Sequence, residues 1–309
     1  MPLNTNRLRI LREVAARGTI TAAAEALYLT PPAVSHQLAT LEREVGVPLL
    51  ERTARSIRLT GPGRRLVEHA ETILAECEAA VADVESLAGQ VSGNVRISVF
   101  QTAAQSIALP ALAGLRARFP SLELDIRELE PFRALPALRA GQLDIALSHE
   151  WDFVPVASDP AFTRYDLLTE AIMVLLPKRH PLAVGGGPVR LRDLANECWC
   201  VAQESAASRE AVERVAHAAG IEPHVILESN YFRAIGSAVE AGLGVGVAPQ
   251  MTDLRGLDIA MRPLIEPSLT RRIFAAVRAG SGESPAVRTV LDAMVEAANA
   301  HGGVGGVAG

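Results

Sequence analysis

The sequence contains no run of about 18 uninterrupted apolar residues, which is close to the shortest length that crosses a bilayer as a helix. We therefore expect no membrane-spanning helix. The opening stretch MPLNTNRLRI places arginines within a helical pattern and has no apolar run before a small-residue cleavage site. This pattern is not typical of an export signal, so we expect a cytoplasmic protein.

Cysteine is scarce, with only Cys77, Cys198 and Cys200. A low, odd count fits a reducing compartment. In a strand, Cys198 and Cys200 point to the same face, but a disulfide between positions i and i+2 requires strained geometry. No third or fourth soft ligand lies nearby in the sequence. We interpret the pair as buried structural thiols and expect no metal site.

Signatures of catalysis are also missing. The chain has no Gly-x-Ser-x-Gly, Walker loop or His-Glu-x-x-His, and no acid pair with catalytic spacing. The stretch AGLGVG at 241–246 superficially resembles a dinucleotide-binding glycine run. However, it follows a helical pattern and enters a strand, which is the wrong order for that fingerprint. We therefore expect no enzyme, no catalytic residue and no cofactor.

A chain of 309 residues is too long for one ordinary compact core, and its length predicts two domains joined by a connection. Net charge is −5, but it is unevenly distributed. Residues 1–65 hold ten arginines and five glutamates, whereas 66–92 hold six acids and no Lys or Arg. A basic segment on an acidic protein indicates a small nucleic-acid-binding head on a larger body. A chance imbalance is the alternative on charge alone.

The basic segment predicts three short helices followed by a hairpin. Apolar spacing and turn residues place the helices near 5–17, 22–27 and 31–45, and a basic two-stranded hairpin at 49–60. Thr19 or Thr21 is expected to cap the second helix. Thr30 is a good N-cap for the third, and the prolines after it are tolerated only in a first helical turn. This order is typical of a winged helix-turn-helix, whose third helix enters the major groove.

The outer face of the third helix is small and polar near its start and is predicted to approach bases. The expected base contacts are Pro31, Pro32, Ser35 and His36. The expected phosphate or minor-groove contacts are Thr21, Thr30, Arg52 and Arg55. A structural ion pair with Glu51 or Glu44 is the alternative for Arg52.

Residues 62–88 predict one long helix with no Gly or Pro after its first two residues. Its apolar residues follow a strict 4-3 spacing with the acids lying off this seam, which is typical of a dimerisation helix. The seam includes Leu66, Ile73, Cys77 and Val84. A helix packed only on its own domain is the alternative.

Beyond Gly93, strand-like and helical segments alternate, among them a helix expected at 106–119 and a strand expected at 172–176. This alternation predicts an α/β domain with mostly parallel strands. We expect α/β architecture overall, and divide the chain as follows: winged helix-turn-helix at 3–61, dimerisation helix and hinge at 62–92, effector-binding domain at 93–300, and disordered tail at 301–309. Lobe I is expected at about 93–165 and 268–300, and lobe II at about 166–267.

Strand-to-helix turns predict a ligand cleft, because a helix N-terminus offers backbone N–H donors. Gln101 and Thr102 follow one strand, and Ser205 follows another in the same relation from the other lobe. A third such turn is expected at 148–150, which adds His149 and the nearby Phe153. The prediction is a small organic anion between the lobes. Nearby Glu204 and Glu150 count against an anion, and simple N-caps without ligand contact are the alternative.

The sequence resembles the LysR-type transcriptional regulators over essentially its whole length. The stretch GTITAAAEALYLTPPAVSHQLATLEREVGVPLLERTARSIRLTGPG follows the family's head pattern, and several body segments follow its effector domain in order and spacing. These body segments are GNVRISVF, LPALAGLRARFPSLELDI, LRAGQLDIAL, LPKRHPLA and VEAGLGVGVAP. Such an ordered set is far more specific than any one piece.

The resemblance implies a cytoplasmic regulator that binds double-stranded DNA, usually as a dimer of dimers. It also implies a two-lobed body of the periplasmic binding-protein type, with an inducer between the lobes that alters DNA bending and contacts with RNA polymerase. One departure lies in the recognition helix, where the family often has Ser-Gln-Pro and an Arg after the next Ser. Here these positions hold Thr30, Pro31, Pro32 and His36, so the half-site cannot be assumed from relatives.

A small-molecule or solute-binding protein with an accessory head is the alternative function. A secretion signal would favour it, whereas the basic head and the apolar seam favour the regulator.

Overall fold

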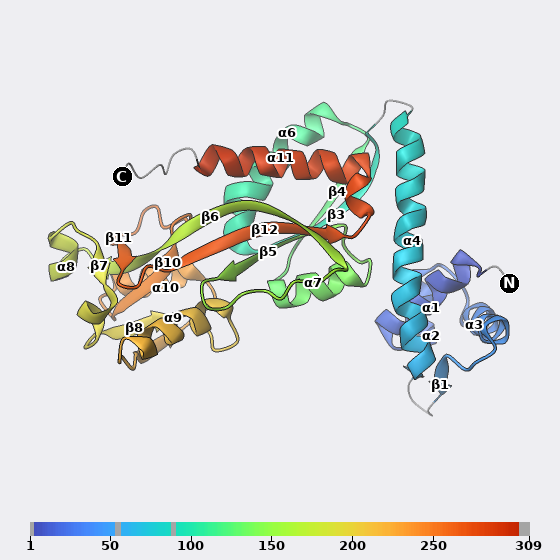
Figure 1. Ribbon diagram of the computed structural model, residues 1–309, viewed down its shortest axis with the longest axis horizontal. Coiled ribbons are helices and arrows are strands. Elements are labelled where there is room, and N and C mark those ends of the chain that lie inside the picture. Colours follow the sequence, from blue (N-terminus) through green and yellow to red (C-terminus); the bar gives the residue numbers. More distant parts are fainter. Residues whose placement is uncertain (1–2, 53–56, 88–90, 303–309) are drawn as a thin grey trace.

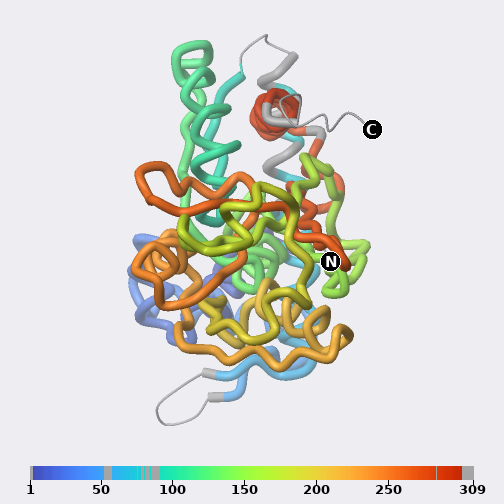
Figure 2. Tube along the Cα trace, turned by 90° about the vertical axis from the view of Figure 1, so that its left-hand side faces the viewer, coloured from blue at the N-terminus to red at the C-terminus, as the bar shows by residue number. Residues whose placement is uncertain are grey.

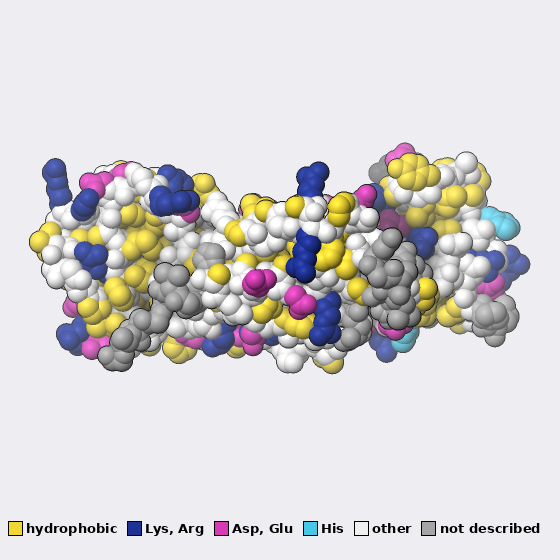
Figure 3. All heavy atoms as spheres, turned by 90° about the horizontal axis from the view of Figure 1, so that it is seen from above, with side chains coloured by type: hydrophobic (Ala, Val, Ile, Leu, Met, Phe, Trp, Pro, Cys, Tyr) yellow, Lys and Arg dark blue, Asp and Glu magenta, His cyan; other side chains and the backbone are white. Residues whose placement is uncertain are grey.

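The computed structural model describes residues 3–52, 57–87 and 91–302. The long helix α4 (Gly61–Leu87) stands between a small helical head and a larger α/β body (Figure 1). Seen from above, the molecule is long and narrow, with the head at one end and charges of both signs mixed over the body (Figure 3). The fold is therefore a helix-turn-helix head, a linker helix and an α/β body, as predicted.

The head contains three helices and a two-stranded antiparallel hairpin. These are α1 (Thr5–Arg17), α2 (Ile20–Ala26), α3 (Pro31–Val45), β1 (Leu50–Arg52) and β2 (Ile57–Leu59). Viewed at 90° to Figure 1, the light-blue strands of the hairpin project at the lower edge of the molecule (Figure 2). This is the winged arrangement that the turn residues predicted, with the tip at 53–56 outside the described residues.

Threonine caps position the second and third helices of the head. The Thr30 hydroxyl accepts the Ala33 N–H at 3.4 Å, which confirms the predicted cap of α3. Thr19 accepts the Ala22 N–H at 3.2 Å and caps α2. Of the two threonines predicted for that cap, Thr21 is therefore not the capping residue; it lies inside α2 and is exposed.

The head core joins all three helices to the start of α4. Buried residues of α1, α2 and α3 pack with Leu49, just before the hairpin, and with two residues of α4. They are Leu8, Ile10, Leu11, Val14, Ala23, Ala24, Val34, Leu38, Leu41, Leu49, Ala70 and Leu74. Each fully buried leucine contributes about 1.5–3 kcal/mol relative to an exposed one. The head and the first half of α4 thus form one packed unit.

One carboxylate of α3 holds the base of the hairpin. Glu42 Oε1 accepts the backbone N–H groups of Leu49 and Leu50 at 2.8 and 3.0 Å. Glu42→Ala should therefore lower the free energy of unfolding of the head by about 1–3 kcal/mol, because two partly buried donors lose their acceptor. Urea unfolding followed by circular dichroism measures this loss. The exposed Glu25→Ala serves as the control, and equal stability of the two variants would contradict the assignment.

The body begins with a strand and alternates strands with helices. In chain order its elements are β3 (Gly93–Val99), α5 (Gln101–Ala103), the π-helical turn η1 (Ala104–Ala108), α6 (Leu109–Arg118), β4 (Leu122–Glu128), α7 (Pro131–Arg139), β5 (Ile145–Trp151), β6 (Phe162–Pro177), α8 (Pro181–Val184), β7 (Val189–Arg190), the 3₁₀ turn η2 (Leu191–Leu194), β8 (Cys198–Val201), α9 (Ala207–Ala218), β9 (His224–Glu228), α10 (Phe232–Glu240), β10 (Val245–Pro249), β11 (Ile259–Ile265), β12 (Thr270–Arg278), the 3₁₀ turn η3 (Ser281–Glu283) and α11 (Pro285–Gly302).

The strands form one path in the order β4-β3-β5-β12-β6-β10-β8-β9, with β11 between β6 and β7. We use lobe I for the half around β3, β4 and β5, and lobe II for the half around β8, β9 and β10. Side chains of β12 alternate between two cores: Ala275 packs with α6 and α11, whereas Phe274 and Ala276 pack with α7. Helices therefore cover both faces of lobe I (Figure 1).

Strand β6 is much longer than the sequence indicated. The expected strand was Ile172–Leu176, but β6 runs from Phe162 to Pro177. Its first half pairs antiparallel with β12, and its second half pairs with β10 and β11. The first half carries Arg164, Asp166 and Glu170 among apolar residues, which obscured the period-2 signal. The strand links the lobes and makes the sheet mixed, with parallel pairs concentrated at β3–β4, β3–β5, β8–β9 and β8–β10.

Two other segments differ from expectation. The helix predicted at Ser106–Phe119 begins at Gln101, so Gln101 and Thr102 lie in its first turn. Helix α11 includes residues 301 and 302, which were expected in the tail, and the remaining tail lies outside the described residues. Within the ranges described, no helix is long and apolar enough to cross a membrane.

Candidate functional site

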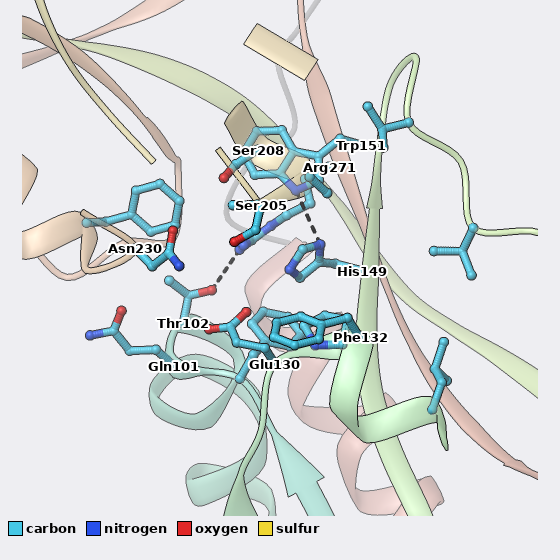
Figure 4. Close-up of a pocket in the computed structure, with 18 of the residues that line it drawn as sticks. Gln101, Thr102, Glu130, Phe132, His149, Trp151, Ser205, Ser208, Asn230 and Arg271 are labelled. Carbon is cyan, nitrogen blue, oxygen red and sulfur yellow. Dashed lines mark hydrogen bonds between the residues drawn. The ribbon is translucent and has the colours of Figure 1, made fainter. Parts of the chain in front are cut away.

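A cavity of about 270 Å³ lies between the lobes (Figure 4). Lobe I contributes the start of α5, the start of α7 and the end of β5, while lobe II contributes the start of α9 and the segment before α10. Most of the wall is apolar, with Phe132, Trp151 and Phe232 among its rings. A small number of polar groups in an apolar cleft is typical of a small-molecule site. We call this cavity the cleft.

Arg271 from β12 is the charged group at the cleft's floor. Its side chain is 2% exposed, and its Nε and Nη2 donate to Glu170 Oε1 at 3.0 and 2.5 Å. Nη2 also donates to the Thr102 hydroxyl at 2.8 Å, a bond drawn in Figure 4. Burial lowers the pKa of Arg271 and the Glu170 carboxylate acts against that shift. A buried cation of this kind is stabilised by its partner and its hydrogen bonds.

One nitrogen of this guanidinium remains available. Arg271 Nη1 makes no hydrogen bond to any residue in the described ranges. The guanidinium lies near two rings, 5.3 Å from the centre of Phe100 and 5.7 Å from that of Trp151. Nη1 carries two N–H groups and part of the positive charge. It can therefore donate to a carboxylate or another acceptor group of a ligand.

His149 lies beside this cation and is neutral. Burial, followed by the charge of Arg271, lowers the pKa of His149 to about 3. The Trp151 indole N–H donates to His149 Nδ1 at 3.2 Å, which leaves the imidazole proton on Nε2 (Figure 4). The imidazole therefore contributes a neutral donor to the cleft rather than a second cation.

Glu130 is the carboxylate that lines the cleft. It is the residue before α7, and burial, then repulsion from Glu128, raises its pKa, while Arg271 lowers it. The two acids that counted against an anion lie elsewhere. Glu150 pairs with Arg164 and Arg272 and does not line the cavity, and Glu204 is exposed outside the lining.

Four of the five predicted cleft residues line the cavity: Gln101, Thr102, His149 and Ser205. Phe153 does not line it; its side chain is 53% exposed and its φ is +67°. The strand-to-helix turn predicted at 148–150 is also wrong, because β5 continues through Trp151 by pairing with β12. His149 reaches the cleft from inside a strand instead of from a helix start.

Sequence reasoning missed several lining residues. They are Glu130, Phe132, Trp151, Ser208, Asn230 and Arg271. The turn before α9, which gave Ser205, could also have given Ser208, whereas no local pattern marked the others. Arg271 is separated by 169 residues from Thr102, which it bonds.

The head presents its predicted contact surface to solvent. Pro31, Pro32 and His36 are exposed on the outer side of α3, and Ser35 is half-buried. Thr21 and Thr30 are exposed near the same end. The side chain of Arg52 and the whole of Arg55 lie outside the described residues. Glu44, one suggested partner of Arg52, forms an ion pair with Arg7.

The seam of α4 is divided between two environments. Leu66 and Ile73 are partly buried against the head core, as the alternative interpretation proposed. Cys77 is exposed, and Val84 is 69% exposed. The second half of the seam is thus an apolar stripe that the head leaves uncovered.

Cys198 and Cys200 lie in the part of the chain that the structure describes, and both are free thiols. Cys200 is buried, and burial raises its pKa. Cys198, expected to be buried as well, is only half-buried, and its Sγ lies 3.6 Å from His224 Nδ1.

Comparisons with known proteins agree with this architecture. Residues 5–64 match the family model for bacterial regulatory helix-turn-helix proteins of the lysR family, and residues 88–299 match that for the LysR substrate binding domain. The probable HTH-type transcriptional regulator LrrA of Synechococcus elongatus is 32% identical over 298 residues, which cover 96% of this chain and 98% of the relative.

Solved structures share the fold. A full-length OxyR variant from Pseudomonas aeruginosa matches with a TM-score of 0.75 at 23% identity, covering 95% of both chains. Full-length CbnR, solved in complex with its target DNA, matches with a TM-score of 0.54 at 22% identity, covering 96% of this chain and 100% of that one. From the capped recognition helix, the linker helix, the two-lobed body and the matches to both family models, we conclude that the chain belongs to the LysR family of bacterial transcriptional regulators.

Proposed function

We propose that this regulator binds operator DNA through α3 as a dimer or a dimer of dimers, and that it responds to a small organic acid held in the cleft. The proposed ligand class rests on one observation. Arg271 lies on the floor of an apolar cavity, and one of its guanidinium nitrogens is bonded to no described residue. The proposed action is binding rather than catalysis. A cytoplasmic location and contact with RNA polymerase are parts of the proposal that come from the family resemblance.

The DNA-binding part of the proposal rests on the exposed start of α3. Pro31, Pro32 and His36 are exposed there without apolar bulk that would block a groove. Thr30 caps α3 and so fixes the position of its first turn. Basic residues Arg9 and Arg17 are exposed on α1 and would add sequence-independent attraction to the backbone.

His36→Ala should relax base preference at one position in each half-site, with a loss of about 1–3 kcal/mol of discrimination. The reason is that the imidazole is the longest polar side chain among the four expected base contacts. Fluorescence anisotropy with duplexes varied one base at a time measures the effect. His217→Ala, an exposed histidine on α9, is the control. If both variants keep the parent's base preferences, His36 does not read the operator.

The ligand is proposed to lie between two helix starts. Thr102 and Gln101 are in the first turn of α5, while Ser205 and Ser208 flank the first residue of α9. A carboxylate placed at Arg271 Nη1 would lie near both, and aromatic walls would cover the rest of the molecule. Each helix end adds about 0.3–1 kcal/mol for an anion.

Titration calorimetry of the full chain with matched acids, amides and amines tests this ligand class. Acids should bind best, and Thr102→Val should weaken them because it removes the acceptor that orients the Arg271 guanidinium. Preference for amines, or acid binding that is indifferent to Thr102, would overturn the proposal.

Glu130→Gln should strengthen acid binding about tenfold, because it removes the one carboxylate among the residues that line the cleft. The raised pKa of Glu130 also gives a direction with pH. As pH falls, Glu130 takes up a proton before an ordinary carboxyl does, so binding of a still-ionised acid tightens in the parent and stays flat in the variant. Glu123→Gln, at an exposed position of β4 outside the lining, is the control. A weaker complex with Glu130→Gln would contradict this assignment.

A further inference from the structure

A second cavity, of about 600 Å³, lies between α4 and lobe I. Glu68 and Glu71 of α4 form one wall, and α7, β6, β12 and the segment 156–159 form the others. Leu135 and Val156 line both this cavity and the cleft, so the two spaces lie back to back. We call it the linker cavity. Its volume is within the usual range for small-molecule sites, about 300–1,000 Å³, and interfaces between domains are where such sites concentrate.

The floor of the linker cavity is apolar and aromatic. Phe162 and Phe274 contribute rings, and each ring has a guanidinium over it. Arg139 lies 5.1 Å from the centre of Phe162, and Arg164 lies 4.0 Å from that of Phe274. The residues that form this floor lie on α7, β6 and β12, and they pack in one hydrophobic core of lobe I.

Most charges in the wall already have opposite charges beside them. Arg139 pairs with Asp159, and Arg164 pairs with both Glu150 and Asp166. Glu68 pairs with Arg65 on its own helix. A ligand would therefore meet these groups as neutralised pairs.

Glu71 is different from the other charged groups. Within the described ranges its carboxyl makes no hydrogen bond and no ion pair, although Arg12, Arg139 and Arg278 act on it from a distance. Burial outweighs these arginines and raises the pKa of Glu71 to about 7. A half-buried carboxyl without a partner is costly, and a donor from a ligand would satisfy it.

The linker cavity and the exposed seam lie on different sides of α4. At 3.6 residues per turn, Glu71 is about 140° from Leu66 and Glu68 is about 200° from it. Cys77 and Val84 fall close to the direction of Leu66. Pairing of two α4 helices through the exposed seam would therefore leave the cavity wall free.

From this placement we propose that the linker cavity binds a small apolar amine, whose ammonium group bonds Glu71 and whose apolar part lies on Phe162 and Phe274. Such a ligand contacts α4 and lobe I at once, and so holds the linker helix against the body. The proposal does not depend on the identity of the ligand in the cleft.

Titration calorimetry on the full chain with 2-phenylethylamine tests the proposal, with 2-phenylethanol and 3-phenylpropionate as probes of matched size. The amine should bind saturably with one site per chain, and the alcohol about tenfold more weakly. Glu71→Gln should weaken the amine about tenfold, whereas Glu76→Gln, the same change on an exposed residue of α4 outside the lining, should not. Absence of saturable amine binding, or equal binding by both variants, would overturn the proposal.

Two further readouts separate the linker cavity from the cleft. Ala157→Trp, at an exposed lining position, should abolish amine binding by filling the space, while Thr102→Val should leave it unchanged. Loss of amine binding in Thr102→Val would place the amine in the cleft and contradict the proposal. Acid binding and DNA binding are measured on the same variants, so failure here is distinguishable from failure of the proposed function.

The pH dependence has a definite sign. The groups that act on Glu71 are Arg12 from α1, Arg139 from α7, Arg278 from β12 and Glu68 from its own helix, and the arginines stay charged throughout. With a pKa of about 7, the Glu71 carboxylate is mostly ionised at pH 8 and mostly protonated at pH 6, so the amine should bind about tenfold more tightly at pH 8. Glu71→Gln should remove this difference. Equal affinity at both pH values in the parent would contradict the role of Glu71.

Discussion

Arg271→Met should lower the free energy of unfolding of the body by about 3–5 kcal/mol. The variant removes the partner of Glu170, whose side chain is 4% exposed and whose remaining contact is the Met251 N–H at 2.9 Å. It also leaves the Thr102 hydroxyl without its donor and removes the cation between Phe100 and Trp151. An isolated buried carboxylate is responsible for most of the expected loss.

The double variant Arg271→Met with Glu170→Gln is the matched control. Glutamine keeps an acceptor for the Met251 N–H and removes the unpaired charge, so most of the lost stability should return. Acid binding in the cleft should not return, because the guanidinium is still absent. Urea unfolding and acid titration of the three proteins measure both effects. If the free energy of unfolding of Arg271→Met lies within about 0.5 kcal/mol of the parent's, the buried ion pair does not stabilise the body as described.

Val84→Glu should reduce operator affinity about 100-fold or more, because two heads on one symmetric site depend on the pairing of their linker helices. Val84 is 69% exposed on the seam and touches no head core in this chain, so a charge there should break pairing without unfolding the head. Analytical ultracentrifugation should show a species of lower mass. Val184→Glu, at a 76% exposed position on α8, is the control.

The choice of Val84 depends on the structure. The seam alone would suggest Ile73, but Ile73 packs against the head core, and a charge there would damage the head as well as any dimer. An unchanged mass and an unchanged affinity in Val84→Glu would place the dimer interface outside the second half of α4.

The head could be predicted almost completely from the sequence because its signals are local. Thr30, followed by two prolines, gave the start of α3, and Gly46 with φ +80° ended it at the expected residue. Apolar spacing gave the face that packs in the core. The cap of α2 was ambiguous because Thr19 and Thr21 are both good caps, and only packing selects Thr19.

The cleft was only partly predictable because its central group is non-local. Thr102 and Ser205 follow strands directly, so their positions could be inferred. Arg271 lies on β12, where it looks like one charge among Arg271, Arg272 and Arg278. Its role depends on β6 carrying Glu170 beside it, and the first half of β6 had no clear strand period. The linker cavity depends on how α4 meets lobe I and had no sequence signal.

The proposed link between the cleft and the DNA-binding head is tested most directly on a complex between the full chain and a duplex that the protein itself selects from random DNA. The measurement is the effect of a cleft-binding acid on this complex. The parent should change operator affinity or DNA bending when the acid saturates the cleft, measured by anisotropy and by energy transfer between the duplex ends. Thr102→Val should bind the same duplex equally well without acid and show little response to it. An acid that saturates the cleft of the parent yet leaves affinity and bending unchanged would contradict the account, as would an equal response in Thr102→Val.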